Sequence, residues 1–183
     1  MKLNKLMMMG TVAGLALALQ APLVAADTGS TTDKRGSLSR EDYEFVTKAT
    51  QGGMTEVELG QLAVQKASDQ SVKDFGQKMV TDHGKANEEL KALATSKNAT
   101  PPVKFSRKED STIADLQKAN GADFDRAYAK AMLKDHKTDV KEFRDAAKDL
   151  KDPDLKAFAQ KTLPVLEEHL RMAEQLEQNV KNK

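Results

Sequence analysis

Three histidines and one glutamate are the residues of this 183-residue chain whose types and positions suggest chemistry. His83, His136 and His169 are its only histidines, and each lies on the apolar stripe of a different predicted helix. Glu56 takes the centre of the stripe of another predicted helix, where an apolar residue is expected. Imidazole and carboxylate groups bind Zn²⁺ and Cu²⁺. These four residues are therefore candidate metal ligands inside the fold.

A polar network without metal explains the same pattern. A lone inward histidine is more often a hydrogen-bonded core residue than a ligand. A buried carboxylate is costly unless it is paired, and one or two of the histidines could pair with Glu56. The sequence leaves both interpretations open, a Glu/His3 metal site and a structural polar layer.

Four amphipathic helices are needed to position these side chains. Apolar residues that recur at spacings of three and four predict each of them. Asp69 and the pair Asp152-Pro153 are typical helix starts, and residues 98–107, with Pro101-Pro102, form the longest internal break. A further break is expected near Asn120-Gly121. The last stripe is predicted as Leu155, Phe158, Thr162, Val165, His169, Met172 and Leu176.

Two hairpins joined by a longer crossover follow from these breaks, so the predicted fold class is an all-α four-helix bundle. Counted from the hairpin turns, Glu56 is level with His83, and His136 is level with His169. The two pairs differ in height by about 5 Å. If both turns lie at the same end of the bundle, all four side chains meet in one layer.

The composition excludes several classes of function. The chain has no Cys, which rules out disulfides, thiolate metal sites and a cysteine nucleophile. Its 29 Lys and Arg residues nearly balance 28 Asp and Glu residues, whereas nucleic-acid binding needs a basic excess. Phosphate-binding loops and common hydrolase motifs are absent from the sequence.

The N-terminus reads as an export signal. Lys2 and Lys5 precede an uncharged apolar run, and the small residues that end at Ala26 suit cleavage there. We expect residues 1–26 to be a signal peptide, residues 27–39 a flexible leader, and residues 40–180 the bundle. The mature protein would be periplasmic or in the outer envelope, with no transmembrane segment after cleavage.

The chain resembles the DUF4142 family of exported bacterial proteins of unknown function, placed in the ferritin-like superfamily. The stretches that carry the resemblance are Gly52-Gly53-Met54-Thr55-Glu56-Val57-Glu58-Leu59-Gly60, Met79-Val80-Thr81-Asp82-His83, Phe124-Asp125 with Tyr128 to His136, and Leu163-Pro164 through His169-Leu170. The resemblance implies a ferritin-like bundle and no reaction. Val80 and Leu166 stand where a Glu-x-x-His di-iron motif would place glutamates, so a single Zn or Cu ion is favoured over a di-iron centre.

The sequence favours an exported, non-enzymatic bundle with a binding or envelope-stress role, its polar layer being structural. The alternative is a periplasmic metal-binding protein that uses Glu56, His83, His136 and His169. A metal-dependent oxidase or hydrolase also needs an open coordination position and substrate access, and neither is visible in a sequence. Lipid binding is disfavoured because the mature chain has no Trp and no basic surplus. A protein partner or oligomeric state cannot be read from it.

Overall fold

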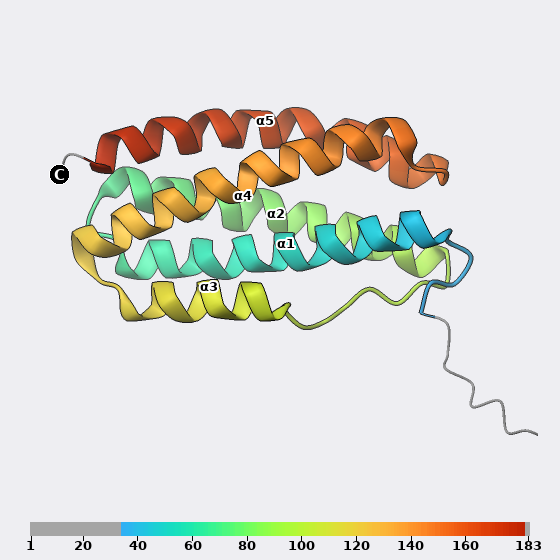
Figure 1. The fold of residues 1–183 in the computed structure, drawn as a ribbon, viewed down its shortest axis with the longest axis horizontal. Coiled ribbons are helices and arrows are strands. Elements are labelled where there is room, and N and C mark those ends of the chain that lie inside the picture. The colour runs from blue at the N-terminus through green and yellow to red at the C-terminus, as the bar shows by residue number, and fades with distance from the viewer. Residues whose placement is uncertain (1–33, 182–183) are drawn as a thin grey trace, which may run out of the picture. The chain divides into compact units, whose positions relative to one another are not determined.

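The structure is a computed structural model that describes residues 34–181. The predicted signal peptide and most of the predicted leader lie outside the described residues. The helices are α1 (Arg40–Lys66), α2 (Gln70–Ser96), α3 (Arg107–Lys118), α4 (Gly121–Asp149) and α5 (Pro153–Lys181), with no strand between residues 34 and 181. Two antiparallel hairpins, α1–α2 and α4–α5, form the four-helix bundle (Figure 1). The predicted all-α bundle is confirmed.

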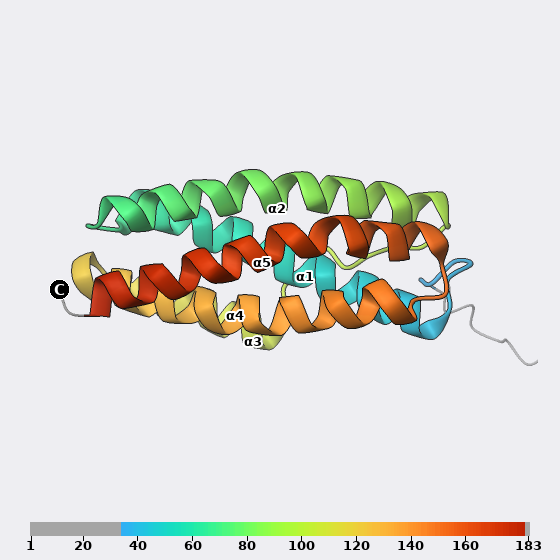
Figure 2. The ribbon, with the colours of Figure 1, turned by 90° about the horizontal axis from the view of Figure 1, so that it is seen from above.

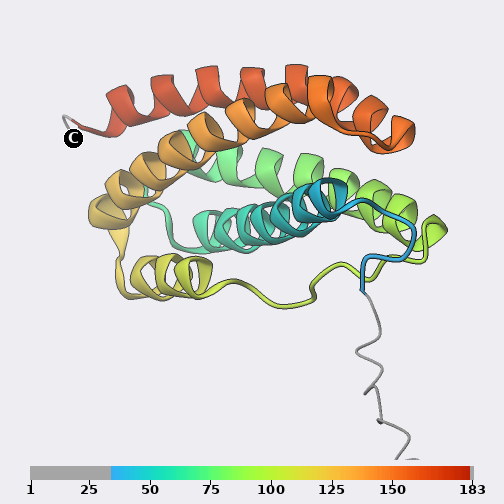
Figure 3. The same cartoon turned by 45° about the vertical axis from the view of Figure 1, so that its right-hand side comes forward.

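The crossover between the hairpins carries α3, which packs on α1 and α4 outside the four long helices (Figures 1 and 3). Ser106 and Glu109 form a reciprocal capping box at its start, so the first backbone donors of this short helix are satisfied. Ile113 and Leu116 form its buried face. The predicted break near residues 120–121 is confirmed, because α4 starts at Gly121 with a positive φ of 56°.

The predicted starts of α2 and α5 are also confirmed. The Asp69 carboxylate accepts a hydrogen bond from the Ser71 backbone N–H, and the Asp152 carboxylate accepts one from the Leu155 N–H. Such side-chain acceptors satisfy N–H groups that have no partner within a helix.

The two hairpin turns lie at opposite ends of the bundle (Figures 1 and 2). Asp125, near the start of α4, accepts hydrogen bonds from the backbone N–H groups of Ser68 and Asp69 in the α1–α2 turn, at 3.1 and 3.0 Å. Asp42, near the start of α1, accepts one from the Lys151 N–H in the α4–α5 turn, at 2.9 Å. Each hairpin thus caps the turn of the other. The condition set for a single polar layer, that both turns lie at one end, is not met.

The polar layer forms nevertheless. Glu56 lies twelve residues before Ser68, and His136 lies eleven residues after Asp125, which is beside Ser68. At about 1.5 Å per residue these two side chains differ in height by only about 2 Å. The four long helices have 27 to 29 residues, and each carries its polar residue near its middle. Reversing one hairpin therefore leaves the layer intact.

Two apolar clusters flank this layer. One cluster includes Leu59, Phe75, Met132 and Leu176, and the other includes Phe45, Leu90, Phe143, Phe158 and Leu166. In all four long helices the polar residue lies between the residues given to the two clusters. The bundle therefore encloses its Glu and His side chains between two apolar halves of the core.

The predicted stripe of α5 is wrong at Val165 and Met172, whereas His169 and Leu176 are buried as predicted. Val165 is 41% exposed, whereas Leu166 is buried, and Ala173 rather than Met172 is fully buried. The observed stripe takes two successive steps of four, from Phe158 to Leu166, because a helix repeats every 3.6 residues and strict alternation of three and four drifts off the core.

Two glycines bring α1 and α2 together. A Cβ on Gly60 would lie 2.6 Å from the Gly76 carbonyl oxygen, and a Cβ on Gly76 would lie 2.7 Å from the Cβ of Ala63. Any larger residue would force the two backbones apart.

None of the helices between residues 34 and 181 has an apolar stretch long enough to cross a membrane.

Candidate metal centre

Glu56 of α1 lies at the centre of the polar layer and contacts two histidines. Its Oε2 lies 2.7 Å from Nδ1 of His83 on α2, and its Oε1 lies 3.1 Å from Nε2 of His136 on α4. Glu56 and His136 are fully buried, and His83 is 6% exposed. Both contacts are at ion-pair distance, but neither has the direction of a hydrogen bond.

Hydrogen bonds hold His136 and His169, one to a backbone carbonyl and one to an aspartate. Nδ1 of His136 donates a hydrogen bond of 3.0 Å to the Met132 carbonyl, one turn earlier on α4. Nε2 of His169, on α5, donates one of 2.9 Å to the Asp82 carboxylate on α2. The Asp82 carboxylate also pairs with Lys78 at 2.9 Å. Carbonyl and carboxylate oxygens only accept, so they fix which ring nitrogen carries the proton.

One nitrogen of each ring is left without a hydrogen-bond partner among the described residues. These atoms are Nε2 of His83, Nε2 of His136 and Nδ1 of His169, and all three are buried. The ring centroids are 5.3 to 5.8 Å apart. A ring nitrogen from each histidine lies within 4.8 Å of one from each of the others. The structure therefore brings together the three histidines that the sequence singled out.

Burial keeps these imidazoles neutral. Loss of solvation lowers the pKa of His83 to about 4, against the opposing charges of Asp82 and Asp135. The same cause lowers the pKa of His169 to about 4 and also lowers that of His136. A neutral imidazole whose N–H is held by an acceptor offers its other nitrogen as a lone pair, the form in which histidine binds metal.

Two aspartates that the sequence analysis did not single out join Glu56. A carboxylate oxygen of Asp135 and one of Asp139, both on α4, lie within 4.8 Å of each other and of a Glu56 oxygen. Burial raises the pKa of Glu56 to about 7 and that of Asp135 to about 7. Burial, and then the Glu56 charge, raise the pKa of Asp139 well above its usual value. Asp135 and Asp139 are four residues apart, which places them on one face of α4. This spacing is the feature of the sequence that could have identified them.

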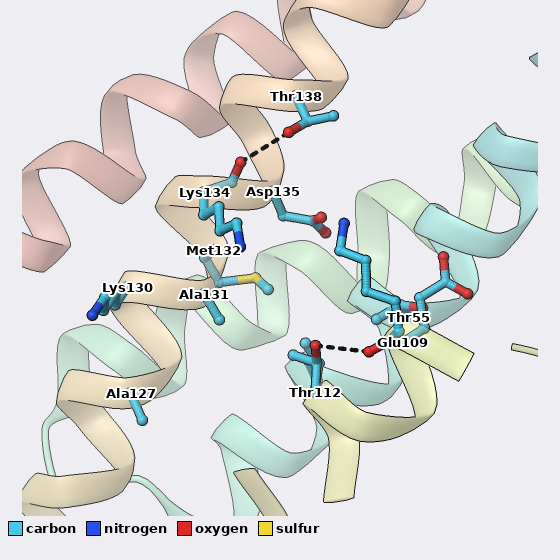
Figure 4. A pocket seen from close by; sticks show the side chains of 12 residues that line it. Thr55, Glu109, Thr112, Ala127, Lys130, Ala131, Met132, Lys134, Asp135 and Thr138 are labelled. Atoms are coloured by element: carbon cyan, nitrogen blue, oxygen red, sulfur yellow. Dashed lines mark hydrogen bonds between the residues drawn. The ribbon is translucent and has the colours of Figure 1, made fainter. Parts of the chain in front are cut away.

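Three cavities border the layer. One of about 20 Å³ is lined by Glu56, His83, Asn87 and Asp139, among others, and holds no more than about one water molecule. Another, of about 330 Å³, lies between α1, α3 and α4. Figure 4 shows the Asp135 carboxylate extending from α4 into it. The third, of about 620 Å³, is lined by His169, among others. The layer is therefore closed at Glu56 and His83, whereas Asp135 and His169 each border a larger space.

The sequence profile of a family described as "Domain of unknown function (DUF4142)" matches residues 27–176. The chain belongs to the DUF4142 family. No curated protein matches it. The fold is similar to a DUF305 fragment from Deinococcus radiodurans, with a TM-score of 0.69, 12% identity, and coverage of 78% of this chain and 98% of that one.

A second similar structure contains a ferritin-like domain beside a DJ-1/ThiJ/PfpI-like domain, in a protein from Anabaena variabilis. Its TM-score is 0.57 and its identity 18%, with coverage of 79% of this chain and 39% of that one. At these identities the likeness shows the fold alone. It supports the ferritin-like bundle predicted for this DUF4142 protein.

The side chains of this DUF4142 protein do not fit a ferritin-type di-iron set. That set takes a Glu-x-x-His motif from each of two helices and a glutamate from each of the others. Here Val80, Leu133 and Leu166 stand three residues before the three histidines. The layer instead has three imidazoles, one each from α2, α4 and α5, and three carboxylates, one from α1 and two from α4.

Proposed function

We propose that this DUF4142 protein is an exported, non-enzymatic metal-binding protein of the periplasm or outer envelope, which holds one Zn or Cu ion between His83, His136 and His169. The observation that carries the proposal is the set of three buried, neutral imidazoles, each with one nitrogen held or faced by an oxygen and the other without a hydrogen bond; among the latter, Nε2 of His136 faces Oε1 of Glu56. A purely structural histidine has no reason to leave a buried nitrogen unpaired.

The ligand set favours Zn or Cu. Imidazole nitrogens suit both metals, and three of them with one further ligand make a tetrahedral site. Glu56 is placed to supply that ligand, because its Oε1 lies 3.1 Å from Nε2 of His136 without hydrogen-bond alignment. Two ligands of one tetrahedral Zn²⁺ ion lie about 3.3 Å apart. The three ring nitrogens would have to close from their present spread of up to 4.8 Å.

A binding role agrees better with the surroundings than a catalytic one. The cavity beside Glu56 and His83 has a volume of only about 20 Å³, so an organic substrate has no room between them. The larger cavity of about 620 Å³ on the other side of His169 meets an imidazole that is itself fully buried. Export rests on the basic start, apolar run and small-residue exit of residues 1–26.

Elemental mass spectrometry of the protein tests this proposal. The full chain is expressed in a bacterium and purified without a tag from the periplasm. We expect an intact mass that starts at Asp27 and about one Zn or Cu per chain. Cytoplasmic retention of the full-length chain would contradict export, and a folded protein that takes up neither metal would contradict the metal site.

A further inference from the structure

The three carboxylates of the layer form a group of their own, separate from the unpaired imidazole nitrogens. Glu56, Asp135 and Asp139 each place an oxygen within 4.8 Å of the other two. In Ca²⁺ sites, with bonds of 2.3–2.6 Å, oxygens on opposite sides of the ion are up to about 5 Å apart. Each pair of oxygens is at most 4.8 Å apart, so a small movement of the side chains brings all three onto one ion.

None of these carboxylates receives a hydrogen bond from the described residues, and the contacts of Glu56 are to imidazoles that burial keeps neutral. Glu56 is fully buried, and neither of its oxygens receives a hydrogen bond from the described residues. Within residues 34–181, Asp135 and Asp139 form no hydrogen bond and no ion pair. Lys108 of α3 is the positive charge that acts on both aspartates, but its ammonium group pairs with neither. Like charges held this close repel one another unless a cation or protons lie between them.

Space and water are available at the same place. Glu56 and Asp139 line the cavity of about 20 Å³, together with Asn87. Asp135 lines the larger cavity of about 330 Å³ between α1, α3 and α4 (Figure 4). Hard divalent cations keep several waters when they bind to a few carboxylates. These two cavities next to the three carboxylates have room for such waters.

We propose that Glu56, Asp135 and Asp139 form a second cation site, which binds one hard divalent ion such as Mn²⁺. Carboxylate and water oxygens are the ligands that Mn²⁺, Mg²⁺ and Ca²⁺ prefer, whereas imidazoles suit Zn and Cu. The layer thus has an oxygen site that faces the α3 side and a nitrogen site that faces α5, with Glu56 between them. This inference goes beyond the proposed function, since it does not need a metal at the histidines.

Electron paramagnetic resonance of Mn²⁺ titrated into the metal-free mature protein tests this site. Free Mn²⁺ gives a sharp six-line signal, and its loss counts bound ions. We expect one bound Mn²⁺ per chain, and binding weakened about 10-fold or more by Asp139→Asn and by Asp135→Asn, since even loss of an outer-shell partner costs that much. Asp145→Asn is the matched control, because Asp145 is an exposed acid on the same helix that pairs with Lys141. It should leave Mn²⁺ binding unchanged.

A second readout guards against variants that do not fold. Mn²⁺ should raise the Tm of the wild-type protein and of Asp145→Asn, and should leave that of Asp139→Asn where it is. The amide keeps the volume of the carboxylate and relieves the repulsion, so Asp139→Asn should fold. The double variant His83→Leu/His136→Leu should still bind Mn²⁺, which separates this site from the histidine site. The proposal would be overturned if folded wild-type protein bound no Mn²⁺. It would also be overturned if Mn²⁺ binding were lost with the histidines and kept in both aspartate variants.

Discussion

His169 and Asp82 are joined across two hairpins, with Nε2 of the imidazole 2.9 Å from Oδ2 of the carboxylate. Asp82 is only partly buried, and Lys78 holds the same oxygen at 2.9 Å. Burial raises the pKa of Asp82, but the hydrogen bonds from Lys78 and His169 outweigh it, so the pKa is lowered. Asp82 is therefore ionised at neutral pH and keeps the proton of His169 on Nε2. This leaves Nδ1 as a lone pair that points away from Asp82.

Replacing Asp82 should weaken metal binding and leave the fold intact. In Asp82→Asn the amide can donate as well as accept, so the orientation and tautomer of His169 are no longer fixed. Loss of such a partner reduces metal affinity by about 10- to 100-fold, which competition with a chelator of known affinity for Zn²⁺ can measure. Asp74→Asn is the matched control, because Asp74 is an exposed residue of the same helix whose carboxylate accepts a hydrogen bond from the Gln70 side chain. Equal affinities for the two variants would remove Asp82 from the site.

Removing two of the three imidazoles should abolish stabilisation by Zn²⁺. Wild-type protein at a Zn²⁺ concentration 100 times the Kd gains about 2.7 kcal/mol in the free energy of unfolding. For a domain of this size that raises the Tm by about 5–10 °C. In His83→Leu/His136→Leu this shift should vanish, while the metal-free bundle stays folded because leucine replaces a buried polar pair. Met79→Leu, one turn before His83, conserves volume and should keep the full shift; a shift that survives in the double variant would sink the site.

Much of this layer could be predicted from spacing. The periodicity placed one inward polar residue near the middle of each long helix, and residues in the middle of four similar helices meet whichever way a hairpin runs. The direction of the second hairpin could not be predicted, because it depends on how the crossover and α3 pack. The contacts that fix it, from Asp42 to Lys151 and from Asp125 to Ser68, join residues more than fifty positions apart.

The acidic residues next to the histidines show another feature that the sequence could not predict. Asp82, Asp135 and Glu168 each precede a histidine in the sequence, and local spacing places all three about 100° away from the core stripe. Only packing separates them: Asp82 meets a histidine of another helix, Asp135 turns toward Glu56, and Glu168 pairs with Arg171 at the surface. One-dimensional periodicity cannot distinguish a flank that meets a neighbouring helix from one that meets water.

The pKa of Glu56 predicts a pH-dependent effect of its removal. Burial raises the pKa to about 7 from an ordinary value of 4.5. Between these values the folded protein holds this proton and the unfolded chain does not, so the contribution of Glu56 to stability falls as the pH rises. The histidine pKa values, lowered to about 4 for His83 and His169, make stability rise between pH 4 and 6.5, but they do so with or without Glu56.

Glu56→Gln should therefore gain stability relative to the wild-type protein as the pH rises. Between pH 5 and pH 8 we expect the difference in the free energy of unfolding to shift in favour of the variant by about 2 kcal/mol. Urea unfolding in metal-free buffer at both pH values measures it. Glu174→Gln, a change at an exposed position on α5, should show a difference that does not vary with pH. A constant difference for Glu56→Gln would mean that Glu56 stays ionised in the folded protein.

The crossing of α1 and α2 at Gly60 predicts opposite effects for two glycine substitutions. A Cβ at Gly60 would lie 2.6 Å from the Gly76 carbonyl oxygen, whereas a Cβ at Gly84, further along α2, meets nothing within 4 Å. Overpacking costs about 1–3 kcal/mol, more than the gain of about 1 kcal/mol in helix propensity. Gly60→Ala should thus lower the free energy of unfolding, and Gly84→Ala should raise it by up to about 1 kcal/mol. Urea unfolding of both variants at pH 7 compares them, and a stabilised Gly60→Ala protein would show that the two helices are not held in contact at this crossing.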